Sequence, residues 1–555
     1  MIEMKHINFF ISALAALTLT ACSLKEHSYT EVSMDVYPES ASEALTVLQG
    51  CYRDLCEDGL YGYYLSLLFT ISSDIAQCEG SSNTSFRVIP TNSHNASTAE
   101  IQTSWSALYN AIYNVNSFIE KVQERMPWWS NNDQEFARAY IAEAKTLRAL
   151  YYFELVRWWG NVPLITSTAE HKIKASEITQ ATPAQVYNFI EKDLLEAQEA
   201  LPWAEDRADS PYYRMSKGSA LGLLLKVYCT WAGYPVKDES KWAEAAAIGR
   251  RMVESGKHRL NPSFEDVWVN TCTGKWDLYE SLIEVSFYSP SGLNSEDCVG
   301  RIGKWNGVVA TSVEGIRGRN AGNWKVVYPF VEQWKTELPD DPRIDLSVAD
   351  YRYGYSNSAG TISTTGKIKY FDTITKANPS EEDYNKQRQL FTPAKWDTEK
   401  YTSGTSSFLT HNDMSNINWY VLRYADVLLL FAEAENEVNG PTAAAYSAFN
   451  LVRQRAFGNK LHNLPDGLSK DQFREEVRKE RARELCFEGH RKQDLIRWGI
   501  YYDTIKQTEQ KVVDWFSSGN YSVSKYTIKG RHELLPIPQK ELDLMKKCHQ
   551  NDGWE

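Results

Sequence analysis

The stretch Asn132–Trp159, NDQEFARAYIAEAKTLRALYYFELVRWW, carries the strongest structural signal in this chain. Asn132 and Glu135 lie three residues apart and predict a capping box at the start of a helix. Gly160 and Pro163 predict its end. Apolar side chains between these signals recur at steps of three and four, as on one helical face: Phe136, Tyr140, Ala144, Leu147, Tyr151 and Leu155. The spacing therefore predicts a helix over 132–159.

Similar apolar stripes occur on both sides of this helix. Trp105–Ile119 predicts an antiparallel partner before it, and a capping box at Ser469 and Gln472 opens a helix near the C-terminus. Further helices are predicted at Thr182–Leu201, Met215–Ala232, Trp242–Glu254, Tyr420–Val438 and Ala443–Ala456. Helical hairpins in series, without a fixed repeat, indicate a mainly α fold with a tetratricopeptide-like scaffold.

The character of the sequence changes between residues 257 and 419. Gly, Ser, Asn and Thr separate short apolar runs such as Leu282–Phe287, which predicts irregular loops with short strands. Long irregular segments in a helical protein are often functional. We therefore expect one domain over 22–555, in which the scaffold of 22–256 and 420–555 holds a loop-rich ligand-binding region at 257–419. A shorter break lies at Glu79–Ala99.

The N-terminus predicts export. Residues 1–21 end in the apolar run Phe9–Ala21, which is too short for a stable membrane-spanning helix. The Leu-Thr-Ala-Cys sequence at Leu19–Cys22 resembles a bacterial lipoprotein signal, which predicts cleavage before Cys22 and lipidation of its thiol. The alternative is an ordinary secretory signal followed by a chance cysteine.

Composition narrows the classes of partner. The net charge of −12 disfavours nucleic acid, which requires a basic surface. Eight cysteines remain after Cys22, without metal-ligand spacing, so no metal or other cofactor is predicted. Buried free thiols are the favoured interpretation, and a disulfide between Cys272 and Cys298 is the alternative.

Motifs for catalysis are absent from the sequence. It contains no nucleophile elbow, zinc-protease motif, phosphate-binding loop or dinucleotide fingerprint. The charged run Arg474–Asp494 is interpreted as a structural network of same-helix pairs, such as Arg481 with Glu484 and Glu488 with Arg491. A glycosidase pair of carboxylates stays open, because such residues meet in space and not in sequence.

Four blocks, in order, carry a family resemblance. They are Ala142–Ile165; Leu422–Asn436 with Leu451–Ala456; Glu480–Gly499 followed by Leu534–Pro538; and the closing Gln550–Trp554. Together they resemble the SusD/RagB family of outer-membrane nutrient-binding lipoproteins. The last block departs from the usual Q-N-P-G-Y ending at Asp552 and Trp554.

The resemblance implies a helical, non-enzymatic protein on the outer face of a Gram-negative outer membrane. Such proteins cover a SusC-like TonB-dependent transporter and capture oligosaccharides for import. A peptide-binding receptor of the RagB kind is the alternative, and a surface glycoside hydrolase is a remote one. Ser23–Glu26 offers only one acidic residue, whereas family members often carry an acidic surface-export signal there.

Ligand contacts are expected from the variable loops. Sugars are bound by flat aromatic faces and by planar polar groups that replace lost water. Ser289–Trp324 interleaves both kinds with glycine, and its arginines also suit the carboxylate or sulfate of an acidic glycan. The alternative is that these tryptophans cover the core. The predicted ligand-binding residues are Trp276, Tyr288, Asn294, Trp305, Arg319, Asn320, Trp324, Asn83 and Arg87.

Overall fold

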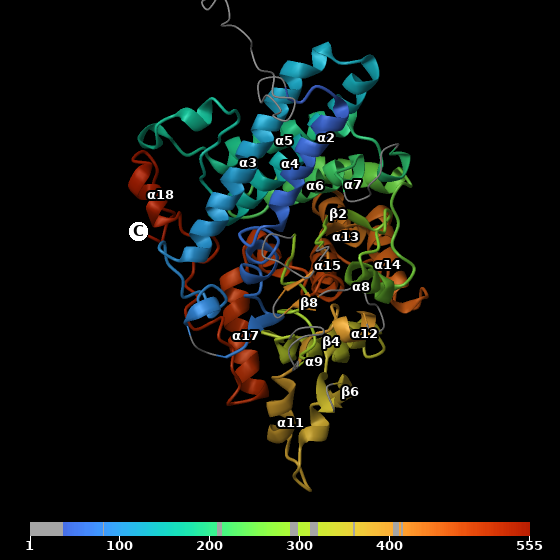
Figure 1. Cartoon of the computed structure of the whole chain (residues 1–555). Helices are drawn as coiled ribbons and strands as arrows, with labels where there is room; N and C mark the ends of the chain where they lie inside the picture. Colours follow the sequence, from blue (N-terminus) through green and yellow to red (C-terminus); the bar gives the residue numbers. More distant parts are fainter. Residues whose placement is uncertain are drawn as a thin grey trace, which may run out of the picture.

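Long helices in the N-terminal half pack as successive neighbours in the computed structural model (Figure 1). The structure describes residues 37–80, 83–207, 214–288, 298–310, 320–358, 361–402, 410–411 and 414–555. The helices of this half are α2 (Ala41–Arg53), α3 (Ala99–Arg125), α4 (Asn131–Trp159), α5 (Pro183–Ala200), α6 (Lys217–Trp231) and α7 (Lys241–Glu254). The predicted mainly helical fold is confirmed.

The C-terminal helices pack back onto the first half. Helix α13 lies against α6 and α7 from the N-terminal half and against α14 and α15 from its own. The helices of this part are α13 (Tyr424–Asn439), α14 (Ala443–Phe457), α15 (Lys470–Glu484), α16 (Arg491–Arg497), α17 (Tyr501–Trp515) and α18 (Gln539–Leu544). The two parts of the predicted scaffold therefore form one packed body.

Helix ends test the capping predictions. The box at Ser469 and Gln472 is confirmed at α15. The box at Asn132 and Glu135 is wrong, because Ser130 is the N-cap of α4 and its Oγ accepts a hydrogen bond from the Asp133 amide at 3.2 Å. Gly160 ends α4 with φ of 69°, a conformation that glycine adopts without strain.

The predicted helix Tyr420–Val438 is wrong in its first turn. Residues Trp419–Arg423 form strand β10, and α13 begins only at Tyr424. Strand β10 pairs antiparallel with β2 (Ser281–Val285), and all five of its residues are buried. A fully buried run of aromatic and branched side chains suits a strand that is covered on both faces.

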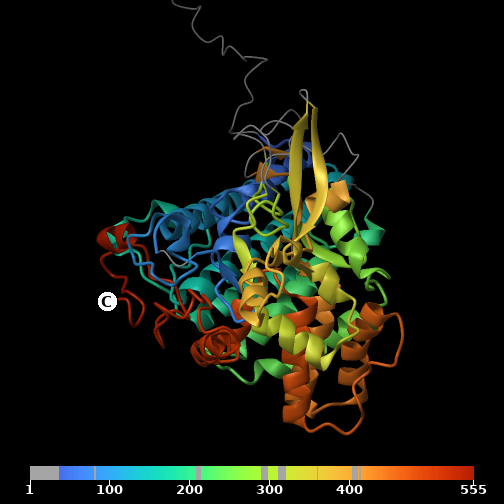
Figure 2. The same cartoon turned by 90° about the horizontal axis from the view of Figure 1, so that it is seen from below.

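The loop-rich region contains short helices as well as the predicted short strands. All its strand pairs are antiparallel and two-stranded: β1 with β3, β2 with β10, β4 with β7, β5 with β6, and β8 with β9. Figure 2 shows the β5–β6 hairpin standing out from the body. Strand β1 (Ala76–Cys78) comes from the N-terminal half and pairs into this region. The elements of the loop-rich region itself are α8 (Phe264–Thr273), β2, β3 (Trp324–Val326), α9 (Tyr328–Glu337), α10 (Arg343–Ser347), β4 (Val348–Ala349), β5 (Tyr351–Ser358), β6 (Thr361–Lys369), α11 (Glu381–Arg388), β7 (Thr392–Pro393), α12 (Thr398–Thr402), β8 (Thr410–His411) and β9 (Met414–Ser415).

Single-turn helices punctuate the connections. They are η1 (Asp54–Cys56), η2 (Tyr64–Leu68), η3 (Ser85–Arg87), η4 (Met126–Trp128), η5 (Glu170–Lys172), η6 (Ala175–Glu177), η7 (Ala204–Asp206) and η8 (Phe371–Thr373). Of these, η1 continues the chain from the end of α2 towards strand β2.

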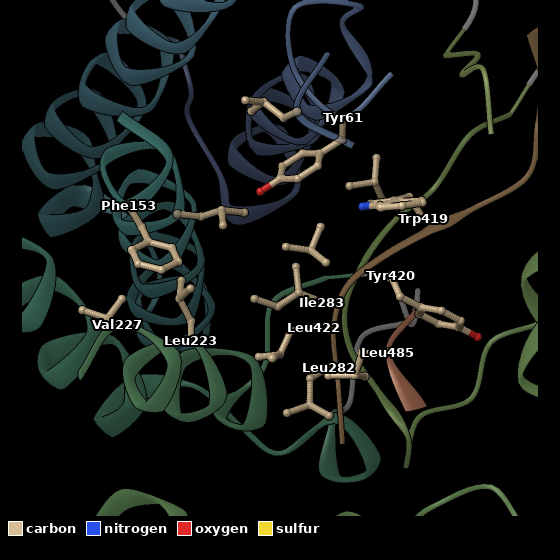
Figure 3. Packing of buried hydrophobic residues seen from close by; sticks show 14 of the residues in the cluster. Tyr61, Phe153, Leu223, Val227, Leu282, Ile283, Trp419, Tyr420, Leu422 and Leu485 are labelled. Atoms are coloured by element: carbon tan, nitrogen blue, oxygen red, sulfur yellow. The ribbon is translucent and has the colours of Figure 1, made fainter. Parts of the chain in front are cut away.

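One hydrophobic cluster joins the scaffold to the loop-rich region. Figure 3 shows Phe153 of α4 and Leu223 of α6 beside Ile283 of β2 and Leu422 of β10. All four side chains are 2% exposed or less. Because the β2–β10 pair is packed directly on the helices, the residues at the ends of these strands are held in fixed positions.

Charged residues of α15 form a buried network that differs from the same-helix prediction. Arg481 binds Asp426 and Asp494 rather than Glu484, and Glu488 binds Arg423 rather than Arg491. Helix α15 ends at Glu484, so Glu488 lies in the turn before α16 and helical spacing does not apply there. The buried pairs are tertiary, whereas more exposed pairs within α15 join Arg478 to Glu475 and Lys479 to Glu476.

The segment 1–36, which contains Cys22 and the predicted signal, lies outside the described residues. Within the part of the chain that the structure describes, no helix has the length and apolar character needed to cross a membrane.

Candidate ligand-binding cavity

A cavity of about 640 Å³ lies where four distant parts of the chain meet. Its walls are formed by the end of α2 with η1, the turn after α8, the C-terminal end of β2 with the residues near it, and the segment ahead of β10. Its volume falls in the range of about 300–1,000 Å³ typical of small-molecule sites. Its lining is Gln49, Tyr52, Arg53, Leu55, Cys56, Thr273, Gly274, Trp276, Glu284, Val285, Ser286, Phe287, Tyr288, Cys298, Asn416 and Asn418.

Local sequence explains why Trp276 reaches this cavity. Helix α8 ends at Gly274, which adopts the left-handed conformation with φ of 66° and donates to the Asn270 carbonyl. Residues with a Cβ adopt this conformation only at a cost, so glycine stops the helix and turns the chain here. The turn directs the next residues, including the half-buried Trp276, along the cavity wall.

Strand β2 brings in Tyr288. The segment that follows β2 continues to Tyr288, whose amide donates to the Cys298 carbonyl at 2.7 Å. Tyr288 is 66% exposed. Its ring is therefore available to a ligand.

The buried carboxyl group of Glu284 lines the cavity and accepts hydrogen bonds. Glu284 accepts hydrogen bonds from Asn418 Nδ2 at 2.8 Å and from Ser281 Oγ at 2.7 Å. Asn418 Oδ1 in turn accepts from the Phe287 amide at 3.2 Å. Burial raises the pKa of Glu284 to about 7, although both side-chain hydrogen bonds oppose that shift.

Glu284→Gln is expected to raise stability above pH 7 by about 3 kcal/mol and to have little effect near pH 4.5. The folded-state pKa of about 7 exceeds the usual 4.5, so the native state holds the extra proton between these values. The unfolding free energy of the parent protein therefore falls as pH rises through this window, while glutamine does not titrate. Urea unfolding of both proteins between pH 4.5 and 8 measures the difference, and parallel profiles would contradict it.

Polar groups at the cavity complement the aromatic rings. Asn416 Oδ1 is buried and has no hydrogen-bond partner among the residues that the structure describes. The amide and hydroxyl groups of Gln49, Thr273 and Asn416 line the same space, and Arg53 is exposed at it. Aromatic faces beside amide and hydroxyl groups suit a ligand with both C–H faces and hydroxyls.

The predicted site residues do not all meet here. Trp276 and Tyr288 line the cavity, whereas Trp305 and Trp324 are only 8% and 2% exposed. The Trp305 ring packs against Tyr63, with centroids 4.7 Å apart, and edge-to-face against Trp324 at 5.5 Å. In the described structure these two indoles are part of the core, the alternative that the sequence left open.

The remaining predicted residues are held by protein partners or lie on the surface. Asn320 is buried and its Nδ2 donates to Thr398 Oγ1 at 2.6 Å. The Arg87 guanidinium donates to the Glu79 carbonyl at 2.7 Å. Asn83 is exposed, and Asn294 and Arg319 lie outside the described residues.

Sequence reasoning missed the contributions of α2 and of the segment before β10. Gln49 and Arg53 sit on an ordinary amphipathic helix, and nothing in its pattern separates them from solvent-facing residues. Asn416 and Asn418 did carry a signal. They alternate with the buried Ile417 ahead of the strand, and alternate residues of an extended segment share one face.

Comparison with known proteins identifies the scaffold around this cavity. Residues 327–554 match the SusD family, and residues 32–229 match a family described as starch-binding and associating with the outer membrane. The solved structure of a SusD homolog from Bacteroides thetaiotaomicron is 49% identical, with a TM-score of 0.89 over 95% of this chain and 99% of that one. The chain belongs to the SusD family.

Other proteins similar to this SusD-family chain are also SusD-like. SusD-like protein P25 of Formosa agariphila is 26% identical over 99% of both chains. A laminarin-binding SusD-like protein shares the fold, with a TM-score of 0.68 and 24% identity over 92% of this chain and 99% of that one. SusD-family proteins are non-catalytic binding proteins, so this chain is not an enzyme. Association with the outer membrane is described for the family that residues 32–229 match.

Proposed function

We propose that this chain is a cell-surface lipoprotein that captures oligosaccharides and delivers them to a SusC-like TonB-dependent transporter. The observation that carries the proposal is the cavity in which Trp276 and the exposed Tyr288 accompany Asn416 Oδ1, an atom without a hydrogen-bond partner among the described residues. Relatives with this fold include a laminarin-binding protein and a surface glycan-binding protein of Bacteroides fluxus. A cavity with rings and hydrogen-bonding groups suits a pyranose, whose faces are apolar and whose edges are polar.

Calorimetric titration tests the proposal. The chain from Ser23 onward is titrated with laminarin, starch, uronate-rich and sulfated glycans, and mixed peptides. Heat with one glycan class supports oligosaccharide capture, and a preference for an anionic glycan implicates Arg53 at the cavity. Heat with peptides alone would replace the proposal with the peptide-uptake alternative.

Delivery and anchoring are tested separately. Co-purification of the intact protein with a SusC-like transporter from solubilised outer membranes supports the partnership. Cys22→Ser removes the thiol proposed to carry the lipid, so it is expected to move the protein from the membrane fraction to the soluble one. Retention of Cys22→Ser, with its signal peptide cleaved, in the membrane of a strain that lacks the transporter would contradict the lipid anchor.

A further inference from the structure

Two cysteines from distant parts of the chain lie in the wall of the cavity. Cys56 is the last residue of η1, and Cys298 is the first described residue after Tyr288; both line the cavity. The Cys56 Sγ donates to the Ser286 carbonyl at 3.4 Å, and the Cys298 carbonyl accepts from the Tyr288 amide at 2.7 Å. The backbone of Ser286 and Tyr288 thus holds both cysteines at one short segment of the cavity wall.

The surroundings of the two cysteines shift the pKa values of their thiols in opposite directions. The hydrogen bond from Cys56, assisted by Arg53, lowers the pKa of Cys298 to about 6, although partial burial opposes the shift. The same contact, together with burial, raises the pKa of Cys56 well above its usual range. Cys298 is therefore the nucleophile, since the thiolate is the reactive form, and Cys56 is placed to attack after it.

We propose that Cys56 and Cys298 form a disulfide bond in the mature protein and so tie the end of η1 to the cavity wall beside Tyr288. The inference rests on the proposed export of the chain, because disulfides persist in oxidising compartments. It replaces the Cys272–Cys298 alternative drawn from sequence spacing. Cys272 is fully buried in α8, whereas Cys56 and Cys298 are half-buried and line the same cavity.

The oxidant is a disulfide-containing oxidoreductase of the cell envelope or a small-molecule disulfide. The Cys298 thiolate attacks one oxidant sulfur, and the oxidant's S–S bond breaks to release one thiolate. The Cys56 sulfur then loses its proton and attacks Cys298 Sγ, which releases the second oxidant thiolate. One protein S–S bond forms, and the two electrons and two protons reside on the oxidant as two thiols.

Thiol counting on the full chain tests the bond. The chain is expressed with its own N-terminus in a bacterial host, recovered from the cell envelope, denatured and alkylated with a maleimide before or after reduction. We expect two fewer adducts before reduction than after, and one non-reduced peptide that joins Cys56 to Cys298. Equal adduct numbers, or a link from Cys298 to Cys272, would overturn the proposal.

A second arm separates failure of the bond from failure of export. If the chain is absent from the envelope fraction, the purified reduced protein is incubated with oxidised glutathione. Closure of Cys56 to Cys298 with loss of glutathione supports the pairing, and a stable glutathione adduct on Cys298 refutes it. Either result leaves the glycan titration as a separate test of the proposed function.

The change in Tm on adding reductant separates loss of the disulfide from altered packing, so it is compared between variants. Reductant is expected to lower the Tm of the oxidised parent by a few degrees, because the bond restrains the unfolded chain. The same reductant is expected to leave the Tm of Cys56→Ser unchanged. Cys272→Ser is the matched control and keeps the response of the parent. An identical response in Cys56→Ser would refute the assignment.

Discussion

Glu484→Gln is expected to lower the free energy of unfolding by about 3–5 kcal/mol. The Glu484 side chain is fully buried and accepts hydrogen bonds from Arg343 at 3.0 Å and Arg423 at 2.7 Å, as well as from Arg455. Burial favours the neutral acid, but the three guanidinium groups outweigh it and lower the pKa of Glu484 to about 2. Glutamine keeps the shape of the side chain but leaves these buried cations without their shared anion.

Glu475→Gln is the matched control for this measurement. Glu475 lies on the same helix and its side chain is 59% exposed; among the described residues its one ion pair is with Arg478 at i+3. Exposed pairs of this kind contribute less than about 1 kcal/mol. Urea unfolding of both variants at pH 7 gives the comparison. A Glu484→Gln effect no larger than that of Glu475→Gln would show that the network does not stabilise the junction of α15, β10 and α14.

Trp276→Ala is expected to weaken binding of the glycan found in the titration by about 30-fold or more, equivalent to about 2 kcal/mol. The indole lines the cavity at the turn set by Gly274, and truncation removes an aromatic face against which a sugar can stack. Because Trp276 is only half-buried, we expect a smaller effect on stability than on affinity. Calorimetry and thermal unfolding on the same sample separate the two.

Trp128→Ala and Trp305→Ala are the two control variants for Trp276→Ala. Trp128 is 82% exposed at the α3–α4 connection and does not line the cavity, so its truncation is expected to leave affinity unchanged. Trp305 is packed among Tyr63, Phe86 and Trp324, so its truncation is expected to reduce stability. Unchanged affinity in Trp276→Ala, with lost affinity in a folded Trp305→Ala, would move the site to the sequence-predicted segment.

Helices were predictable because their signals are local. The stripe from Phe136 to Leu155 lies within one helix, and the capping box at Ser469 involves atoms three residues apart. The Tyr420–Val438 error has the same origin. The strand Trp419–Arg423 exists because β2 pairs with it, and no local periodicity records a partner so far away in sequence.

Charge pairs also depend on contacts between residues that are distant in sequence. Helical spacing suggested Arg481 with Glu484, since both lie on α15. In the folded protein Glu484 faces inward and meets guanidinium groups from α10, β10 and α14. Buried charges take the partners that packing brings within reach, because leaving one unpaired costs several kcal/mol.

The sequence by itself determined the helical scaffold and the family, because the signals for both lie in short contiguous stretches of residues. Tertiary structure alone decided which aromatic residues face a cavity. Trp276 and Trp305 occur in similar glycine-containing segments, yet one lines the cavity and the other is covered by Tyr63, Phe86 and Trp324. Exposure depends on which distant segments cover a ring, and packing sets that covering only when the whole chain has folded.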